Sequence, residues 1–276
     1  MKILKELLTE IAEEVDRIAK KIISQGNPGE DLGMGADGTP TKLIDEAAES
    51  ACIQILNKRK ENINILSEEC GFIDNGAEYT LVLDPIDGTH NAIRRIPFYS
   101  VSLAVGKNRL SDVKYGLVKN LASGDTFWAE KGKGAFLNDM PLKARSFDQK
   151  DSLFSIYVGR RATPRTYNVA NIPRRTRALG CASLEMCLLA TGSFDVYFLN
   201  YTPSKYSMRV VDIAASTLIL REAGGEVFND TYDILDMDFN LKARSNVIAV
   251  GDLKAIEFLK AQENIQNFKQ PKEDKK

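Results

Sequence analysis

The sequence predicts an α+β first half followed by an α/β second half, and three features of the chain support this prediction. Long helical patterns come first, short apolar segments separated by Gly, Asn or Ser turns then continue to about residue 150, and strand and helix patterns alternate beyond it. We therefore expect helices on an antiparallel sheet over 1–150, an α/β half over 151–262 and a polar tail over 263–276.

The first expected elements are a helix and a loop. Apolar residues recur at helical spacing over 3–23, with charges of both signs opposite, which favours packing on the protein body over a membrane surface. Residues 26–41 are rich in Gly, Asp and Pro and predict a mobile loop. Within it, Gly33-x-Gly35-x-x-Gly38 matches the dinucleotide fingerprint in its letters only, because no apolar strand precedes it.

The remaining elements follow in order. A second helix is expected over 43–58, and strands over 63–66, 79–83, 99–107, 113–119 and 125–130, the last three as an antiparallel meander. In the second half we expect strands over 153–158, 194–199 and 246–250, with helices over 183–191, 209–223 and from 252. Residues 261–276 are polar and charged, so we expect them to fray.

Composition excludes several classes of function. The 276 residues hold 37 Lys and Arg against 38 Asp and Glu, so no global basic field favours nucleic acid or an anionic membrane. No segment predicts a membrane span or a signal peptide, and a cytoplasmic protein is expected. The four cysteines form no C-x-x-C pair, which favours buried thiols and leaves a disulfide open. A single histidine, His90, argues against triad and zinc chemistry.

Two acids follow an apolar strand in the segment Leu81–Thr89. Asp84 and Asp87 are three residues apart, with Pro85 between them and Gly88 directly after them. Because Pro85 bends the chain, both carboxylates and the Ile86 carbonyl could converge beyond the strand, and a following helical turn would suit a phosphate. A surface turn is the alternative interpretation for either Asp taken alone.

Other acids lie in comparable contexts. Glu68 and Glu69 follow an apolar segment, Asp45 opens the second helix, and Asp212 lies among Val, Ile and Ala. Clustered carboxylates raise one another's pKa unless a cation neutralises them, and ligands that are all oxygen select Mg²⁺ or Mn²⁺. A buried acid without a partner is costly, so Asp212 is either exposed, caps a helix or binds a cation.

These motifs together resemble the inositol monophosphatase superfamily, and within it the archaeal-type enzymes that combine fructose-1,6-bisphosphatase and inositol-1-monophosphatase activity. The resemblance covers about residues 1–260 and rests on the strings 67–69, 84–89, 211–215 and 222–225, with lesser matches at 37–45, 131–136 and 180–192. It implies a layered αβαβα sandwich with the site between the halves, a homodimer, and a Mg²⁺-dependent phosphatase.

The resemblance also implies roles for single residues. One Mg²⁺ would be held by Glu68, Asp84 and the Ile86 carbonyl, a second by Asp84, Asp87 and Asp212, and a third, looser ion by Glu68 and Asp37. Asp45 and Thr89 would orient the attacking water, with Asp37 as a further catalytic residue. Substrate contacts would come from Asp87, Gly88, Thr89 and Ala182.

The expected substrate depends on departures from the family pattern. Where inositol-selective relatives usually have a Glu, this chain has Lys205, which favours a ligand with a second phosphate. Further candidates for that phosphate are Arg94, Arg95, Arg174, Arg175 and Arg177. We therefore expect fructose 1,6-bisphosphate and inositol 1-phosphate as substrates and a place in gluconeogenesis. A nucleotide 3′,5′-bisphosphate or NADP phosphatase and a non-catalytic sugar-phosphate binder are the alternatives.

Overall fold

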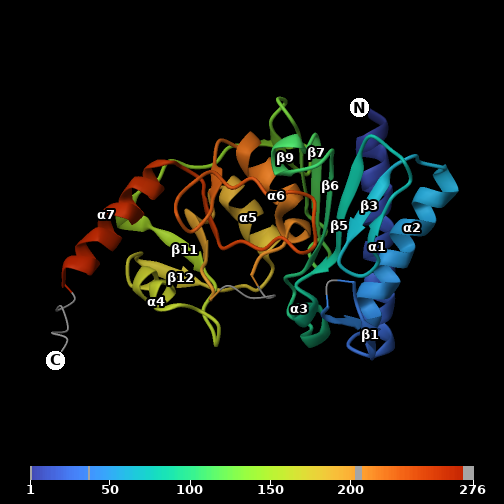
Figure 1. Cartoon of the computed structure of the whole chain (residues 1–276), viewed down its shortest axis with the longest axis horizontal. Helices are drawn as coiled ribbons and strands as arrows, with labels where there is room; N and C mark the ends of the chain where they lie inside the picture. The colour runs from blue at the N-terminus through green and yellow to red at the C-terminus, as the bar shows by residue number, and fades with distance from the viewer. Residues whose placement is uncertain (1, 37, 203–206, 270–276) are drawn as a thin grey trace.

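Helices and sheets alternate along the longest axis of the molecule in the order αβαβα (Figure 1). The structure is a computed structural model that describes residues 2–36, 38–202 and 207–269. The arrangement confirms the predicted layered sandwich. None of the helices in these ranges combines the length and apolar character needed to cross a bilayer.

The outer layer on the N-terminal side consists of α1 (Lys2–Gln25) and α2 (Leu43–Arg59). One face of α1 is apolar and buried, including Leu8, Ile11 and Val15, and it packs with α2 on the first sheet. The amphipathic pattern of the sequence therefore serves packing, as expected.

The first sheet has eight strands in the order β10-β9-β8-β7-β6-β5-β3-β4. Their bounds, in that order, are Met140–Leu142, Ala135–Leu137, Thr126–Glu130, Tyr115–Asn120, Ser100–Gly106, Thr80–Asp87, Asn64–Ser67 and Gly71–Ile73. The meander is antiparallel as predicted, but β3 and β5 run parallel. Strand β4 returns the chain after β3, so β5 starts from the same end, and the carboxyl ends of β3 and β5 share one edge.

The second sheet has five strands in the order β12-β11-β13-β15-β14. Their bounds are Arg175–Arg177, Leu153–Ile156, Val196–Leu199, Val247–Val250 and Glu226–Phe228. Strand β11 pairs parallel with both neighbours, whereas β15 pairs antiparallel with both of its own. The sequence did not predict β12, because its three residues are exposed and polar.

Helices α5 (Ala182–Ala190) and α6 (Val210–Glu222) lie between the two sheets (Figure 1). Almost every residue of α6 is buried, and the helix contacts β6, β7 and β8. Gly116 permits this packing, since a Cβ there would lie 2.8 Å from the carbonyl oxygen of Ala215. Helices α4 (Pro164–Ala170) and α7 (Lys254–Lys269) cover the far face of the second sheet.

One short α-helix and two 3₁₀ turns connect these layers, and a hairpin replaces part of a predicted loop. Helix α3 (Thr89–Arg94) follows β5, and single 3₁₀ turns cover Leu110–Asp112 and Gln149–Asp151. The prediction of a mobile loop over 26–41 is wrong for part of that segment, where β1 (Asp31–Met34) and β2 (Pro40–Lys42) form an antiparallel hairpin. Backbone pairing builds this hairpin, and β1 is fully exposed, so no apolar pattern signals it.

The C-terminal helix extends further than the sequence suggests. We expected fraying from residue 261, but α7 continues to Lys269. Arg165 of α4 holds it there through Glu263, with Nε–Oε1 and Nη2–Oε2 distances of 2.6 and 3.0 Å. A bidentate ion pair between two polar side chains gives no apolar signal in the sequence.

Candidate active site

A cavity of about 410 Å³ opens at the edge where β3 and β5 end. Its residues come from the ends of β3 and β5, the hairpin β1–β2, the first turns of α2 and α3, and the start of α6. The lining residues are Thr39, Pro40, Lys42, Asp45, Glu68, Glu69, Asp84, Ile86, Asp87, Gly88, Thr89, His90, Ile93, Ser207, Arg209 and Asp212.

The two acids of strand β5 reach the cavity together because the strand is irregular there. Asp84 pairs with Ser102 and Asp87 with Ser100, so the register shifts between them. Residues three apart on a regular strand would face opposite sides of the sheet, and a bulge removes that alternation. Pro85, which has no N–H to donate, lies inside the irregular segment.

Asp84 is the most enclosed acid of the site. It is 2% exposed, and its Oδ1 has no hydrogen-bond partner among the described residues. Burial, and then the charges of Glu68, Asp87 and Asp212, raise its pKa well above the usual range. An ionised Asp84 therefore needs a cation.

Asp87 is anchored by the start of α5. Its Oδ2 accepts from the Ser183 N–H at 2.7 Å, the Ser183 hydroxyl at 2.6 Å and the Cys181 thiol at 3.2 Å. Burial raises its pKa, and the bonds from Ser183 oppose that rise. The sequence assigned no role to Ser183 or Cys181, although both fall in the 180–192 match, because a serine in the first turn of a helix is common.

The segment before α5 is held by a buried carboxylate that the sequence did not single out. Glu185 is fully buried and accepts from the N–H groups of residues 179, 180 and 181 at 2.9, 3.1 and 3.2 Å, and from the Ser155 hydroxyl. It therefore fixes the backbone that presents Cys181 and Ser183 to Asp87.

Glu68 follows a strand of the first sheet and Asp212 lies in the neighbouring helix layer, and both pair with the same arginine. Asp212 Oδ1 accepts from Arg209 Nη2 at 2.7 Å and from Nε at 3.0 Å, and Glu68 Oε2 pairs with Arg209 Nη1. Asp212 Oδ2 also accepts the backbone N–H of Arg209 at 2.7 Å, which caps α6. Of the alternatives that the sequence left for Asp212, capping is present, and Arg209 pairs its charge; its binding of a cation stays a prediction.

Asp45 and Thr89 form a separate pair. The Thr89 hydroxyl lies 3.1 Å from Asp45 Oδ1 and 2.9 Å from the Ile86 carbonyl oxygen. Burial, and then the charge of Glu69, raise the pKa of Asp45 to about 7, against the bond from Thr89. The structure thus places together the two residues that were expected to orient water.

Gly88, a predicted phosphate contact, lies directly before Thr89 at the start of α3. Its φ of 85° is left-handed, and a Cβ would lie 3.1 Å from the Cβ of Cys181. Only glycine fits both conditions, so the chain can turn sharply into α3 after Asp87. Ala182 is the first residue of α5 on the other side of the same contact.

The donor set fits divalent cations. Within the described part of the chain, no group of three His, Cys, Asp or Glu side chains is already arranged around a metal position. The Arg209 guanidinium lies between two of the acids, Glu68 and Asp212. The unpartnered Asp84 Oδ1 and the raised pKa values of Glu68, Asp84 and Asp87 show an excess of buried acid. Carboxylate and carbonyl oxygens are the ligands of Mg²⁺ and Mn²⁺.

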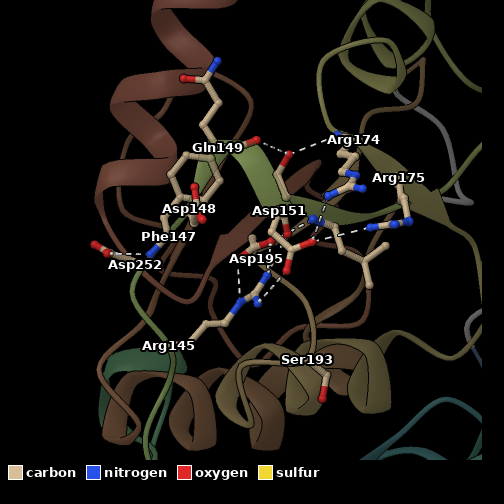
Figure 2. Close-up of polar contacts among 12 residues, drawn as sticks. Arg145, Phe147, Asp148, Gln149, Asp151, Arg174, Arg175, Ser193, Asp195 and Asp252 are labelled. Atoms are coloured by element: carbon tan, nitrogen blue, oxygen red, sulfur yellow. Dashed lines mark hydrogen bonds and ion pairs between the residues drawn. The ribbon is translucent and has the colours of Figure 1, made fainter.

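The arginines proposed for a distal phosphate lie elsewhere. Figure 2 shows Arg174 and Arg175 directed at Asp151, at 3.7 and 3.5 Å, while Arg145 binds Asp195. Arg177 is exposed on β12, and its Nη1 donates to the Thr176 carbonyl at 2.7 Å. None of these side chains lines the cavity, and Asp37 and Lys205 lie outside the described residues.

The fold and this cavity define a class of protein: a layered α and β sandwich whose site is built from buried carboxylates at strand ends beside helix starts. The sequence profile of the inositol monophosphatase family matches residues 4–264. The chain therefore belongs to the inositol monophosphatase family, which confirms the resemblance noted in its motifs.

Individual relatives agree with this assignment. The chain is 39% identical to fructose-1,6-bisphosphatase/inositol-1-monophosphatase of Methanothermobacter thermautotrophicus, covering 91% of this chain and 92% of the relative. A solved inositol monophosphatase–fructose 1,6-bisphosphatase superposes with a TM-score of 0.82 at 31% identity, covering 94% of this chain and 98% of that one. A bifunctional NADP phosphatase/NAD kinase of Methanococcus maripaludis is 34% identical over 90% of this chain, but this covers only 47% of that protein.

Proposed function

We propose that this protein is a Mg²⁺-dependent phosphatase that hydrolyses fructose 1,6-bisphosphate at the 1-phosphate, and inositol 1-phosphate. The observation that carries the proposal is the buried Asp84 carboxylate, whose Oδ1 has no hydrogen-bond partner among the described residues and which lies among further acids beside the start of α3. The names of the archaeal relatives, which join these two activities, support the choice of substrates.

The acids have separate assignments in this proposal. Two ions would be held by Glu68, Asp84, the Ile86 carbonyl, Asp87 and Asp212, and a third, looser one would involve Asp37. When bound, such ions make water a better nucleophile at neutral pH and neutralise the departing oxygen. Mn²⁺ offers the same preference for oxygen ligands and is the expected substitute.

Two residues of the chain, Thr89 and Asp45, can take up the proton that the attacking water releases. Thr89 Oγ1 lies within hydrogen-bond distance of two acceptors, Asp45 Oδ1 and the Ile86 carbonyl oxygen. When its hydroxyl donates to Asp45, its lone pairs can accept a hydrogen bond from the attacking water, so the hydroxyl can pass a proton from that water to Asp45. With a pKa near 7, Asp45 can accept that proton at neutral pH. No side-chain nucleophile is needed, which agrees with the single histidine, His90, lying exposed at the cavity.

The phosphate would be held by backbone rather than by arginines. The first N–H groups of α3 have no partner inside that helix, and Gly88 and Thr89 present them to the cavity. Ala182, at the start of α5, would add a contact. Contact of Lys205, Arg174 and Arg177 with a second phosphate stays a prediction, and Arg174 and Arg177 do not line the cavity in the structure.

Initial rates on four substrates test this function. We expect phosphate release from fructose 1,6-bisphosphate and inositol 1-phosphate in Mg²⁺, and none in chelator. Adenosine 3′,5′-bisphosphate and NADP complete the panel. A rate on either nucleotide at least about tenfold above the sugar bisphosphate would overturn the assignment.

The nucleotide alternative has one observation in its favour. Two bifunctional NADP phosphatase/NAD kinase relatives cover 90% and 88% of this chain, at 34% and 32% identity. Each alignment covers 47% of the relative, so only half of such a protein corresponds to this chain. The same panel distinguishes this alternative.

Assembly and location are also part of the proposal. We expect a cytoplasmic homodimer that acts in gluconeogenesis, as the resemblance to the archaeal-type enzymes implies. Light scattering of the purified protein measures the mass in solution. A monomer at micromolar concentration would contradict the dimer.

A further inference from the structure

Arg209 occupies the space between two acids that the proposed function assigns to different cations. Its side chain is only 18% exposed, and three of its nitrogens are engaged: Nη1 with Glu68, and Nη2 and Nε with Asp212. Arg209 directly precedes α6, whereas Glu68 directly follows β3. One guanidinium therefore joins the two sides of the cavity.

The charge of Arg209 offsets part of the repulsion among the buried acids. Burial raises the pKa of Glu68, and the largest opposing influence is Arg209. The neighbouring carboxylates in turn raise the pKa of Arg209, although its own burial disfavours charge. A guanidinium stays protonated under all ordinary conditions, so it can act as a permanent counter-charge.

The same contacts conflict with binding of divalent cations. Glu68 Oε2 and Asp212 Oδ1 are the atoms that Arg209 holds, and a cation bound to either acid would lie within a few ångströms of the guanidinium charge. A guanidinium at that position would also fill the volume that a hydrated ion requires. Arg209 must therefore leave these oxygens when the cations enter.

We propose that Arg209 is an internal counter-cation that stabilises the metal-free protein by bridging Glu68 and Asp212, and that divalent cations displace it. This inference rests on the proposed function for the identity of the cations. It predicts that Arg209 weakens Mg²⁺ binding and stabilises the metal-free fold, two effects that a residue acting only on substrate would not have.

The test compares Arg209→Gln with Arg209→Lys. Glutamine removes the charge and keeps hydrogen-bonding capacity, while lysine keeps the charge. Calorimetry without substrate should show Mg²⁺ bound at least about tenfold more tightly by R209Q than by wild type, with R209K closer to wild type. In EDTA, R209Q should have the lowest Tm, and saturating Mg²⁺ should bring its Tm close to that of wild type.

Arg165→Gln is the matched control. Arg165 is also a partly buried arginine in a bidentate pair, with Glu263, and it lies outside the cavity. This variant should lower the Tm equally in EDTA and in Mg²⁺ and leave Mg²⁺ affinity unchanged. A further measurement on wild type avoids any folding defect: the Nε–H resonance of Arg209 should shift as Mg²⁺ is added.

The outcomes are distinct. An unchanged or weaker Mg²⁺ affinity in R209Q, or an unchanged Arg209 resonance in wild type that binds Mg²⁺, overturns this inference alone. Wild-type protein that binds no Mg²⁺ overturns the proposed function and the inference together.

Discussion

Asp84 and Asp87 end the same strand, yet their carboxylates have different surroundings. Asp87 Oδ2 already accepts three hydrogen bonds from residues at the start of α5, whereas Asp84 Oδ1 has no partner among the described residues. Asp87 is thus fixed in orientation before any cation binds, while Asp84 remains open to one. In a metal site, Asp87 would offer an oxygen in a fixed position, and Asp84 would offer a negative charge that no protein group has paired.

Asp87→Asn and Asp212→Asn should abolish turnover without unfolding the protein. Each removes one proposed ligand and also relieves repulsion among buried acids. Because loss of a residue that merely supports a ligand costs about 10–100-fold, we expect a loss of at least about 100-fold here. Phosphate release and circular dichroism measure the two properties, and wild-type activity in either variant would contradict the site.

Glu185→Gln should destabilise the protein and misplace Asp87. The amide would turn one acceptor into a donor facing backbone N–H groups, and an unmet buried group costs about 1–3 kcal/mol. Urea unfolding measures that loss, and KM should rise as well. Glu257→Gln, on an exposed face of α7, is the control and should change neither property.

Residue-level reasoning from sequence predicted the acids and missed the groups that hold them. Glu68, Asp84, Asp87 and Asp212 could be found because an acid after an apolar segment is unusual. Ser183 and Arg209 could not, since a serine or an arginine near a helix start is common. Contacts with residues far away in the chain give them their importance.

At the scale of elements, two motifs that look unrelated in the sequence meet at one carboxylate. Glu222, the last residue of α6, accepts from the Gly132 N–H at 2.7 Å and the Gly134 N–H at 2.9 Å. These glycines belong to the turn between β8 and β9. The segments 131–136 and 222–225, which both match the family, therefore contact each other where α6 meets the first sheet, and these contacts lie outside the cavity.

Gly116→Ala should weaken the packing of α6 on the first sheet. The added methyl group would lie 2.8 Å from a backbone oxygen of α6, which cannot rotate away as a side chain could. Overpacking of this kind costs about 1–3 kcal/mol. Thermal unfolding should show a lower Tm, whereas Ala122→Ser, which also adds one heavy atom at an exposed position, should leave it unchanged.

Elements with an apolar pattern were predicted within a few residues, and those without one were missed. Helix α1 has an apolar face at helical spacing, whereas α5, α6, β6 and β7 are buried almost throughout, and both kinds of apolar pattern can be seen in the sequence. The hairpin β1–β2 and strand β12 have no such apolar pattern, because their residues are mostly polar and exposed. Thr41 of that hairpin bonds the Glu69 carboxylate, which holds the hairpin beside the cavity.

At the scale of the whole molecule, the metal-free protein should lose stability as pH rises. The pKa of Asp45 is raised from 3.8 to about 7, so the folded state holds a proton that the unfolded state releases. This contribution is fully present below pH 3.8 and is lost as pH rises through about 7. Glu68, Asp84 and Asp87 act in the same direction.

Urea unfolding in EDTA at several pH values between about 5 and 8 tests this prediction. One such group contributes at most about 1.4 kcal/mol per pH unit. Asp45→Asn should reduce the slope, and saturating Mg²⁺ should reduce it further, because bound cations favour the ionised acids. If the free energy of unfolding in EDTA increased with pH over this range, the conclusion that these acids are buried with raised pKa values would be contradicted.

Layer order could be predicted only through family resemblance. Local patterns indicated which segments are helices and strands, but they could not show that β3 and β5 run parallel, since a three-residue strand returns the chain between them. That pairing decides the site, because it brings the ends of both strands, with Glu68 and Asp84, to one edge.

The cavity draws on β3, β5 and the start of α6, so its acids are far apart in the order of synthesis. A ribosome must deliver most of the chain before Asp212 can join Glu68 and Asp84. If these acids form the metal site as proposed, a nascent chain has no complete site with which to hydrolyse a phosphate ester, and activity begins only once α6 has docked between the two sheets.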